Sequence, residues 1–213
     1  MQQMDYILYG AGGHAKVITD IVHAQGGRII GIMDDHQTGQ WRGIPILGGM
    51  NMINQIISVY PQTSWLVAIG DNQIRRRVTD QLGLLGVCWG KAIHPDSIIG
   101  SGVVIGEGTV LMPRVVINAD SIIGRHVILN TAVTVDHDNR IADYVHLSPG
   151  VHTAGNVTIG EESHIGIGAS LIPGVKVGCR SLIGASACVV KDIPNHVVAV
   201  GCPAKVIKNW HKG

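Results

Sequence analysis

The feature that most constrains this chain is an apolar residue that returns at every sixth position from residue 93 to residue 189. Isoleucine, leucine or valine fills sixteen of these seventeen positions, and only Thr153 departs from the pattern. A frame held over about a hundred residues is the hexapeptide signature of a parallel β-helix. The sequence therefore predicts that nearly half of the chain is a stack of short strands.

Each six-residue unit of such a helix contributes one short strand and one turn, with the apolar residue pointing inward. Three units close a triangular coil, so the units present here give about five to six coils and a prism roughly 25 Å tall. Glycine follows the apolar position at residues 100, 106, 124, 160, 166, 178 and 184, and we interpret these small residues as permitting tight corners. The total of 29 glycines and the absence of phenylalanine fit such narrow layers.

The first ninety residues follow a different pattern, in which strands alternate with helices. Strands are predicted at residues 6–9, 29–33 and 65–69, and helices at residues 17–22, 53–59 and 75–85. Alternation of this kind predicts a parallel sheet with crossover helices. We therefore expect a Rossmann-like α/β domain at residues 1–90, followed by the parallel β-helix at residues 91–213 with a short C-terminal tail.

A glycine-rich loop links the first predicted strand to the first predicted helix, with the spacing Gly10-x-Gly12-x-x-Ala15. Asp34 and Asp35 end the second strand about twenty residues later, which is the layout of a dinucleotide-binding fingerprint. Glycines let the backbone approach phosphates, and a helix N-terminus favours anions. The domain is too short for a full NAD site, and an NAD-linked oxidoreductase would leave the β-helix unexplained. A tight turn without a ligand is the other reading.

Composition and charge argue against several classes of partner. The formal net charge is +1, and we interpret the longest basic run, Arg75–Arg77, as decorating a helix, so neither nucleic acid nor a membrane surface is expected as a partner. No apolar run approaches the ~20 residues that a membrane span needs, and the N-terminus has no secretion-signal pattern. The four cysteines form no CxxC pair, so we expect reduced, mostly buried thiols in a cytoplasmic protein.

Four stretches carry a resemblance to a known family: Gly10–Ala15, Met33–Asp35, Asn130–Asp138 and Gly201–Lys205. The chain resembles the hexapeptide-repeat sugar acetyltransferases of the sialic acid O-acetyltransferase and UDP-N-acetylbacillosamine N-acetyltransferase group along nearly its whole length. This resemblance implies a left-handed β-helix and a homotrimer, with acetyl-CoA lying between adjacent β-helices and no metal. It also implies N-acetylation of a nucleotide-linked amino sugar, in particular a UDP-4-amino-4,6-dideoxy sugar used in glycan synthesis.

His137 is the candidate general base, because acetyl transfer to an amine requires a group that accepts the nucleophile's proton. It lies two residues past an inward position and is flanked by Asp136 and Asp138. A carboxylate bonded to one ring nitrogen fixes the tautomer and makes the other nitrogen more basic, and the resemblance assigns that role to Asp138. No cysteine or serine stands beside a base, so we expect direct transfer in a ternary complex. A solvated D-H-D-N turn is the alternative without chemistry.

The resemblance assigns further site residues one by one. It implies that acetyl-CoA is contacted by His146, Gly155, Ile167 and Ala185, with the Gly155 N–H as the oxyanion donor. It implies that Gly12, Gly13 and His14 contact the phosphates of the nucleotide sugar and that Asp34 and Asp35 recognise its base or ribose. Gly70 ends the third predicted strand at the same edge of the sheet, so we also expect it to bind substrate.

Several alternatives stay open at this stage. Asn130 either helps to hold the acceptor amine or is a rung of an internal asparagine ladder. One alternative function is that of a sialic acid O-acetyltransferase, in which the acceptor of the acetyl group is a sugar hydroxyl instead of an amine. His146, His152 and His164 also suggest a γ-class carbonic anhydrase, but His146 and His152 are six residues apart, so we expect their rings to diverge rather than to share a zinc ion. A non-enzymatic scaffold is the remaining possibility.

Overall fold

The computed structural model describes residues 3–210. The chain divides into two compact units, Met1–Pro95 and Asp96–Gly213, which are described separately below. Among residues 3–210, no helix has both the length and the apolar character that a bilayer crossing requires.

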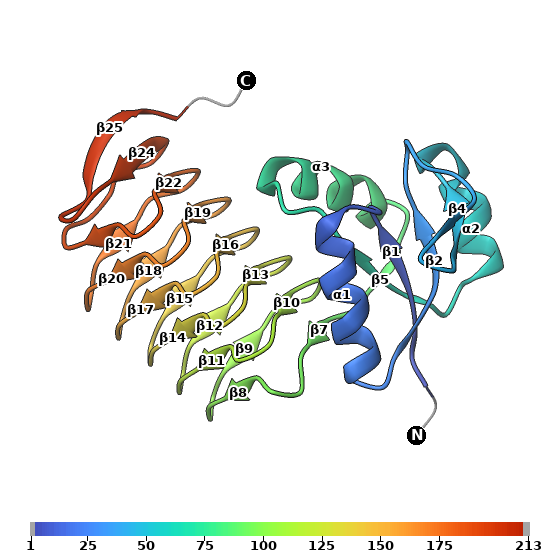
Figure 1. Cartoon of the computed structure of the whole chain (residues 1–213), viewed down its shortest axis with the longest axis horizontal. Coiled ribbons are helices and arrows are strands. Elements are labelled where there is room, and N and C mark those ends of the chain that lie inside the picture. The colour runs from blue at the N-terminus through green and yellow to red at the C-terminus, as the bar shows by residue number, and fades with distance from the viewer. Residues whose placement is uncertain (1–2, 211–213) are drawn as a thin grey trace. The chain divides into compact units, whose positions relative to one another are not determined.

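The first unit is a twisted six-stranded sheet with crossover helices (Figure 1). In sheet order its strands are β3 (Gln40–Trp41), β4 (Ile44–Gly48), β2 (Arg28–Met33), β1 (Asp5–Tyr9), β5 (Ser64–Val67) and β6 (Cys88–Trp89). All neighbours are parallel except β3 and β4. The helical elements are α1 (Gly13–Ala24), the 3₁₀ turn η1 (Met50–Met52), α2 (Ile53–Val59) and α3 (Asn72–Gly83). β7 (Ala92–Ile93) lies near the end of this unit.

The predicted elements of this unit are present, with two differences that have local causes. α3 starts before the predicted residue 75, because the Asp71 carboxylate caps it by accepting the N–H groups of Gln73 and Ile74. The hairpin β3–β4 was not predicted. Its two-residue turn, Arg42–Gly43, has positive φ at both positions, as a type I′ hairpin requires.

The core of the first unit forms between the sheet and its helices. It contains Ile7, Tyr9, Met33, Ile53, Ile56, Trp65, Val67, Val78 and Leu82, all buried. Burial of each such side chain contributes about 1.5–3 kcal/mol. Trp65 is among the largest buried side chains of this core, in a chain that has no phenylalanine.

The second unit is a β-helix of two-residue strands that stack as successive coils on three faces (Figure 1). The first face contains β10 (Val110–Leu111), β13 (Ile128–Leu129), β16 (His146–Leu147), β19 (His164–Ile165) and β22 (Leu182–Ile183). The second face contains β8 (Ile98–Ile99), β11 (Val116–Ile117), β14 (Thr134–Val135), β17 (His152–Thr153), β20 (Ser170–Leu171) and β23 (Cys188–Val189). The third face contains β9 (Val104–Ile105), β12 (Ile122–Ile123), β15 (Arg140–Ile141), β18 (Thr158–Ile159) and β21 (Lys176–Val177).

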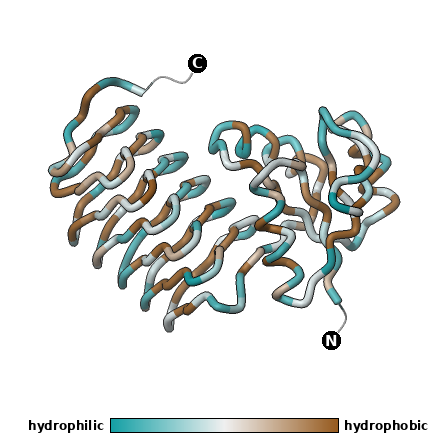
Figure 2. The backbone as a smooth tube through the Cα atoms, viewed as in Figure 1, coloured by the Kyte–Doolittle hydropathy of each residue, from teal (hydrophilic) through white to brown (hydrophobic). Residues whose placement is uncertain are grey.

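The six-residue frame predicted from the sequence is confirmed, and with it the fold class of an α/β domain plus a left-handed β-helix. Each of the strands β7 to β23 ends on a residue of the apolar frame. From Leu111 to Val189 these residues are buried, and apolar residues recur along every coil (Figure 2). Thr153 keeps the frame as a buried residue whose hydroxyl donates to the Thr134 carbonyl.

The glycines that follow the apolar positions are not what permits the tight corners, contrary to our expectation. Every sixth residue from Gly102 to Ser186 has positive φ, but the glycines that directly follow the apolar positions do not. Those glycines instead lie where successive coils approach each other. A Cβ at Gly106, for example, would lie 2.5 Å from the backbone of Gly124 in the next coil.

The C-terminal segment forms a pair of strands rather than the short tail that we predicted from the sequence. β24 (Val197–Val200) extends the first face beyond β22 and pairs antiparallel with β25 (Lys205–Asn209). The last residues of the predicted tail, 211–213, lie outside the described part of the chain. The four cysteines are free thiols, but the prediction that most are buried was wrong: Cys88 and Cys202 are exposed, and Cys179 and Cys188 are half-buried.

Candidate active site

A cavity of about 650 Å³ lies at the carboxyl ends of the strands of the first unit. The chain runs from β1 toward β2 and β4 on one side, and from β5 toward β6 on the other, so the loops after β1 and β5 diverge at this edge. Such a switch point is where open α/β sheets bind ligands. The cavity brings together six of the predicted substrate-binding residues: Gly12, Gly13, His14, Asp34, Asp35 and Gly70.

The glycine-rich loop gives this cavity an anion-binding character. α1 begins at Gly13, and its N-cap residue, Gly12, has no side chain that could satisfy the first N–H groups of the helix. No acidic residue occupies the first turn. Free N–H groups together with the helix dipole favour a negatively charged ligand at this point.

The two aspartates hold the wall of the cavity in place. Asp34 accepts the N–H groups of Ala11, His36 and Gln37 at 2.8–3.0 Å, which fixes the glycine-rich loop against the end of β2. Asp35 accepts the Tyr9 hydroxyl and the Met50 N–H. The bond from Tyr9 and the bond from Met50 lower the pKa of Asp35, so this carboxylate is ionised at neutral pH.

His14 contributes a buried nitrogen that lacks a partner. Its Nε2 atom is buried and has no hydrogen-bond partner among residues 3–210. Burial, together with the nearby charge of Arg75, lowers the pKa of His14 to about 4. The imidazole is therefore neutral at pH 7. A buried polar atom without a partner that also lines a cavity is well placed to bond to a ligand.

Helix α3 supplies lining residues that sequence reasoning missed. Arg77 and Gln81 are one turn apart on α3 and both line the cavity, whereas we had interpreted Arg77 as a residue that decorates a helix. Arg77 is exposed, and no described residue forms an ion pair with it. The signal was available in principle, because a helix that starts at the end of β5 presents its first turns to the same edge of the sheet as the glycine-rich loop.

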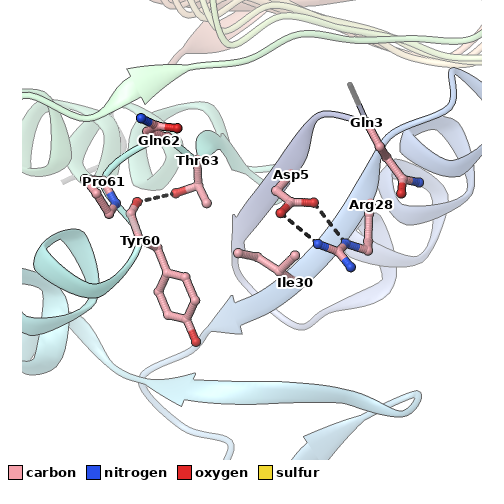
Figure 3. Close-up of a pocket in the computed structure, with 8 residues that line it drawn as sticks. All are labelled: Gln3, Asp5, Arg28, Ile30, Tyr60, Pro61, Gln62 and Thr63. Carbon is pink, nitrogen blue, oxygen red and sulfur yellow. Dashed lines mark hydrogen bonds and ion pairs between the residues drawn. The ribbon is translucent and has the colours of Figure 1, made fainter. Parts of the chain in front are cut away.

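A second cavity, of about 730 Å³, lies at the opposite, amino ends of the strands (Figure 3). Asp5 and Arg28 form a two-bond ion pair in its wall, and Tyr60 accepts the Thr63 hydroxyl through its carbonyl. This pair is exposed and already complete, so it contributes little stability and leaves no free charge for a ligand. None of the predicted site residues lies here.

In the second unit, His137 and Asp138 form the expected pair. The corner that follows β14, which we call the second corner, joins the second face to the third and carries both residues. His137 Nδ1 lies 2.8 Å from Asp138 Oδ2, and both side chains are more than half exposed. The bond to Asp138 and the charge of Asp136 raise the pKa of His137. Asp138 has φ of 59°, so the corner itself turns its carboxylate toward the preceding residue.

Asn139 holds this corner from inside the prism. It is fully buried, and its side-chain N–H₂ donates to the carbonyls of Asp136, His137 and Ala154 at 2.8–3.2 Å. The Asp136 carboxylate in turn accepts the His137 N–H and the Asn118 amide, both at 2.8 Å. The backbone that carries the imidazole is therefore fixed on both sides.

Gly155 lies under the His137 ring, one coil further along. A Cβ at this position would lie 2.6 Å from both Cε1 and Nε2 of His137, so only glycine lets the ring take this position. No described residue accepts a hydrogen bond from the Gly155 N–H. The second corner thus brings together His137, Asp138 and Gly155, which were predicted separately.

The remaining predicted residues gather at a different edge. The first corner joins the first face to the second. It carries Asn130 in one coil, Ile167 two coils further along and Ala185 in the coil after that. His146 lies beside it on β16, with its Nε2 atom 3.4 Å from the side-chain nitrogen of Asn130. Asn130 is thus not a buried ladder rung, and within one chain it does not share a corner with His137.

The other histidines do not converge on a metal site. His146 and His164 stack with ring centroids 4.6 Å apart on the first face, whereas His152 lies on the second face, bonded to Thr134. Across residues 3–210, no three or more His, Cys, Asp or Glu side chains are grouped so that they could hold a metal ion.

Solved structures share the fold of this chain over nearly their whole length. PerB from Caulobacter crescentus, in complex with CoA and GDP-perosamine, is 37% identical, with a TM-score of 0.91 over 96% of this chain and 97% of that chain. The acetyltransferase domain of PglB from Neisseria gonorrhoeae is 39% identical, with a TM-score of 0.91 over 96% of this chain and all of that chain. This chain belongs to the family of hexapeptide-repeat sugar acetyltransferases. The enzyme class predicted from the sequence, an acyltransferase, is confirmed for the family.

Two further matches fall on parts of this acetyltransferase. Residues 5–82 match the family described as the PglD N-terminal domain, and this range covers strands β1 to β5 and the lining of the cavity in the first unit. The UDP-N-acetylbacillosamine N-acetyltransferase of Bacillus subtilis is 38% identical over 107 residues, which is 49% of this chain. That alignment spans about half the length of this curated relative.

Proposed function

We propose that this acetyltransferase transfers the acetyl group of acetyl-CoA to the amine of a nucleotide-linked 4-amino-4,6-dideoxy sugar, with UDP as the nucleotide. The observation that carries the proposal is the His137–Asp138 pair beside the free N–H of Gly155. The solved relatives support the two substrate classes, since PerB is in complex with CoA and GDP-perosamine.

The chemistry follows from the geometry of the second corner. Asp138 occupies Nδ1 of His137, so Nε2 is the atom that accepts the proton of the sugar amine as the nitrogen attacks the thioester carbon. The carbonyl oxygen becomes an oxyanion, which accepts a hydrogen bond from the Gly155 N–H. Collapse of the intermediate breaks the C–S bond, and CoA leaves with the proton that His137 held. The products are CoA and an N-acetylated nucleotide sugar for glycan synthesis.

A homotrimer explains why the predicted residues lie on two corners. Acetyl-CoA in a groove between two prisms would contact the second corner of one copy, with Gly155, and the first corner of its neighbour, with Ile167 and Ala185. His146 and Asn130, beside that first corner, would then lie near the acceptor amine. We place the reaction in the cytoplasm, because acetyl-CoA and nucleotide sugars are intracellular metabolites.

The cavity of the first unit is the proposed nucleotide site. The N-terminus of α1 and the unpartnered Nε2 of His14 would donate to the diphosphate. Asp34 and Asp35 already accept backbone and tyrosine hydrogens, and the remaining lone pairs of these carboxylates would meet the ribose or base. Arg77 adds a positive charge on the facing helix.

The substrate assignment is tested with a panel of UDP-, dTDP- and GDP-linked amino sugars plus acetyl-CoA, following release of the CoA thiol. We expect the highest kcat/KM with a UDP-4-amino-4,6-dideoxy sugar and none with the same sugar lacking the amine. Free sialic acid is the control for O-acetylation. Turnover of sialic acid in preference to every amino sugar would overturn the proposal.

Arg77→Ala is expected to raise the KM for the nucleotide sugar roughly tenfold and to leave kcat nearly unchanged, because a charged hydrogen bond to a phosphate is worth about 1.5 kcal/mol. Arg76→Ala is the matched control, since Arg76 is on the same helix, forms a 3.8 Å ion pair with Asp80 and does not line the cavity. Steady-state kinetics at low and high salt give the KM and kcat of both variants. Equal KM values for the two variants would remove Arg77 from the site.

Gly155→Ala is expected to lower kcat about 100-fold, because a methyl group there must push the His137 ring by about an ångström. The KM for the nucleotide sugar should not change. Gly83→Ala, at the end of α3 with open space around it, is the control. An unchanged kcat for Gly155→Ala would mean that the ring position seen here is not the catalytic one.

A further inference from the structure

The segment Gly201–Ala204 lies along the last strand of the second face. The Cys188 N–H donates to the Gly201 carbonyl at 3.0 Å, and the Ala204 N–H donates to the Cys188 carbonyl at 2.8 Å. In a parallel ladder a residue bonds to the two residues that flank its partner. The partner of Cys188 is therefore Cys202, with one extra residue, Pro203, before the second bond.

This register brings two thiols together. Paired strands lie about 4.8 Å apart, which is inside the Cα–Cα range of about 4.4–6.8 Å that a disulfide requires. The side chains of paired residues project from the same side of a sheet, so this register places the thiols of Cys188 and Cys202 side by side. The neighbouring Cys202 thiol, together with burial, raises the pKa of Cys188. Cys202 is exposed, whereas Cys188 is half-buried.

We propose that Cys188 and Cys202 form a redox-active dithiol that low-molecular-weight disulfides such as oxidised glutathione convert to an intramolecular disulfide. The exposed Cys202 thiolate attacks one sulfur of oxidised glutathione, forms a mixed disulfide and releases one glutathione. The Cys188 thiolate then attacks the Cys202 sulfur and releases the second glutathione. The two protein thiols lose two electrons and two protons, which reappear in the two glutathione thiols.

The bond would fasten the end of the β-helix. Cys188 belongs to β23, the last strand of the second face, and Cys202 lies in the connection between β24 and β25. Terminal coils have a neighbour on one side only and open most readily. A covalent link between β23 and this connection restrains that opening, so oxidation should protect the C-terminal hairpin.

The experiment equilibrates the full chain with excess oxidised glutathione and then counts thiols and maps peptides by mass spectrometry. The free thiols are expected to fall from four to two, with one disulfide joining the peptides of Cys188 and Cys202. The melting temperature should rise on oxidation and return with dithiothreitol. Cys202→Ser should remove the disulfide and the shift, and Cys188→Ser should stop at a single glutathione on Cys202.

Cys179→Ser and Cys88→Ser are the matched controls, and each should still form the disulfide. Retention of all four thiols in the oxidised sample would overturn the proposal. A disulfide that includes Cys88 or Cys179, or that joins two chains, would overturn it as well. These readouts measure no acetyl transfer, so they stand apart from the proposed enzymatic function.

Discussion

Replacing His137 with alanine is expected to lower kcat by about 10²–10⁴-fold, the contribution that a positioned general base makes. The substitution removes the only group at the second corner that is placed to take the amine proton through a free ring nitrogen, as judged over residues 3–210. The side chain is exposed, so the fold and the proposed trimer should survive. Turnover is measured by thiol release, and assembly by light scattering.

The pH dependence tests the same assignment independently. The base acts in its neutral form, so kcat should fall as the pH drops through the pKa of His137, which the bond to Asp138 and the charge of Asp136 raise above 6.5. Asp138→Asn removes the first of these causes. We expect the acidic limb of its profile to move to lower pH and its plateau to be lower, because the neutral ring is also a weaker base.

His23→Ala is the control for this series, since His23 is exposed on α1, far along the sequence from the second corner. It should retain normal turnover. If His137→Ala turned over at a near-normal rate, or if Asp138→Asn left the acidic limb where it was, His137 would be a solvated corner residue and the base would have to be sought elsewhere.

The second large effect concerns acid stability and His14. Its pKa is about 4 in the folded chain, against an ordinary value of 6.5, because the ring is buried. The unfolded chain therefore takes up a proton between pH 6.5 and pH 4 that the folded chain does not. Stability is full above pH 6.5 and falls as the pH drops toward 4, by up to about 3 kcal/mol from this one residue.

His14→Gln should flatten the dependence of the unfolding free energy on pH across this window, and His23→Gln, on the same helix, should not. Denaturant titrations at pH 7, 5.5 and 4.5 measure the difference, and the ring proton shifts of His14 in NMR spectra report the pKa directly. Titration of His14 near pH 6.5 would contradict the buried, neutral imidazole. Addition of UDP is expected to change this titration, because a phosphate at Nε2 gives the ring a partner.

The fold could be predicted to a large extent from the sequence because the β-helix repeats its constraint seventeen times. One position, Thr153, departs from the apolar pattern, yet the six-residue repeat can still be recognised. The reason for the glycines that follow the apolar positions could not be predicted from the sequence. Positive φ at the corners occurs at residues as different as Asp138 and Tyr144, whereas these glycines are required because successive coils approach closely there. The hairpin β3–β4 escaped notice because its strands are short and its turn, Arg42–Gly43, carries a weak signal.

The candidate site could be predicted only in part. The residue type and neighbours of His137 indicate its chemistry, and the bond to Asp138 is a nearest-neighbour contact that sequence reasoning can reach. The missing partner of His14 Nε2 and the place of Arg77 depend on how α1 and α3 meet the sheet edge, which no local pattern encodes. The other predicted site residues of the β-helix lie on two corners because one coil contains eighteen residues. Two residues therefore share a corner only when they are about a multiple of eighteen positions apart.

That step of eighteen limits how the length of this chain can change. From β8 to β23, each strand of the prism pairs with the strand eighteen residues away, as Thr134 pairs with His152. An insertion or deletion of one whole coil only lengthens or shortens the stack. A change of six residues before β14 would keep every apolar side chain inward yet carry His137 around to another edge, away from any neighbour that completes its pocket. Active length variants should therefore differ from this chain by whole coils of eighteen residues. Variants that differ by a single six-residue unit should fold but be inactive.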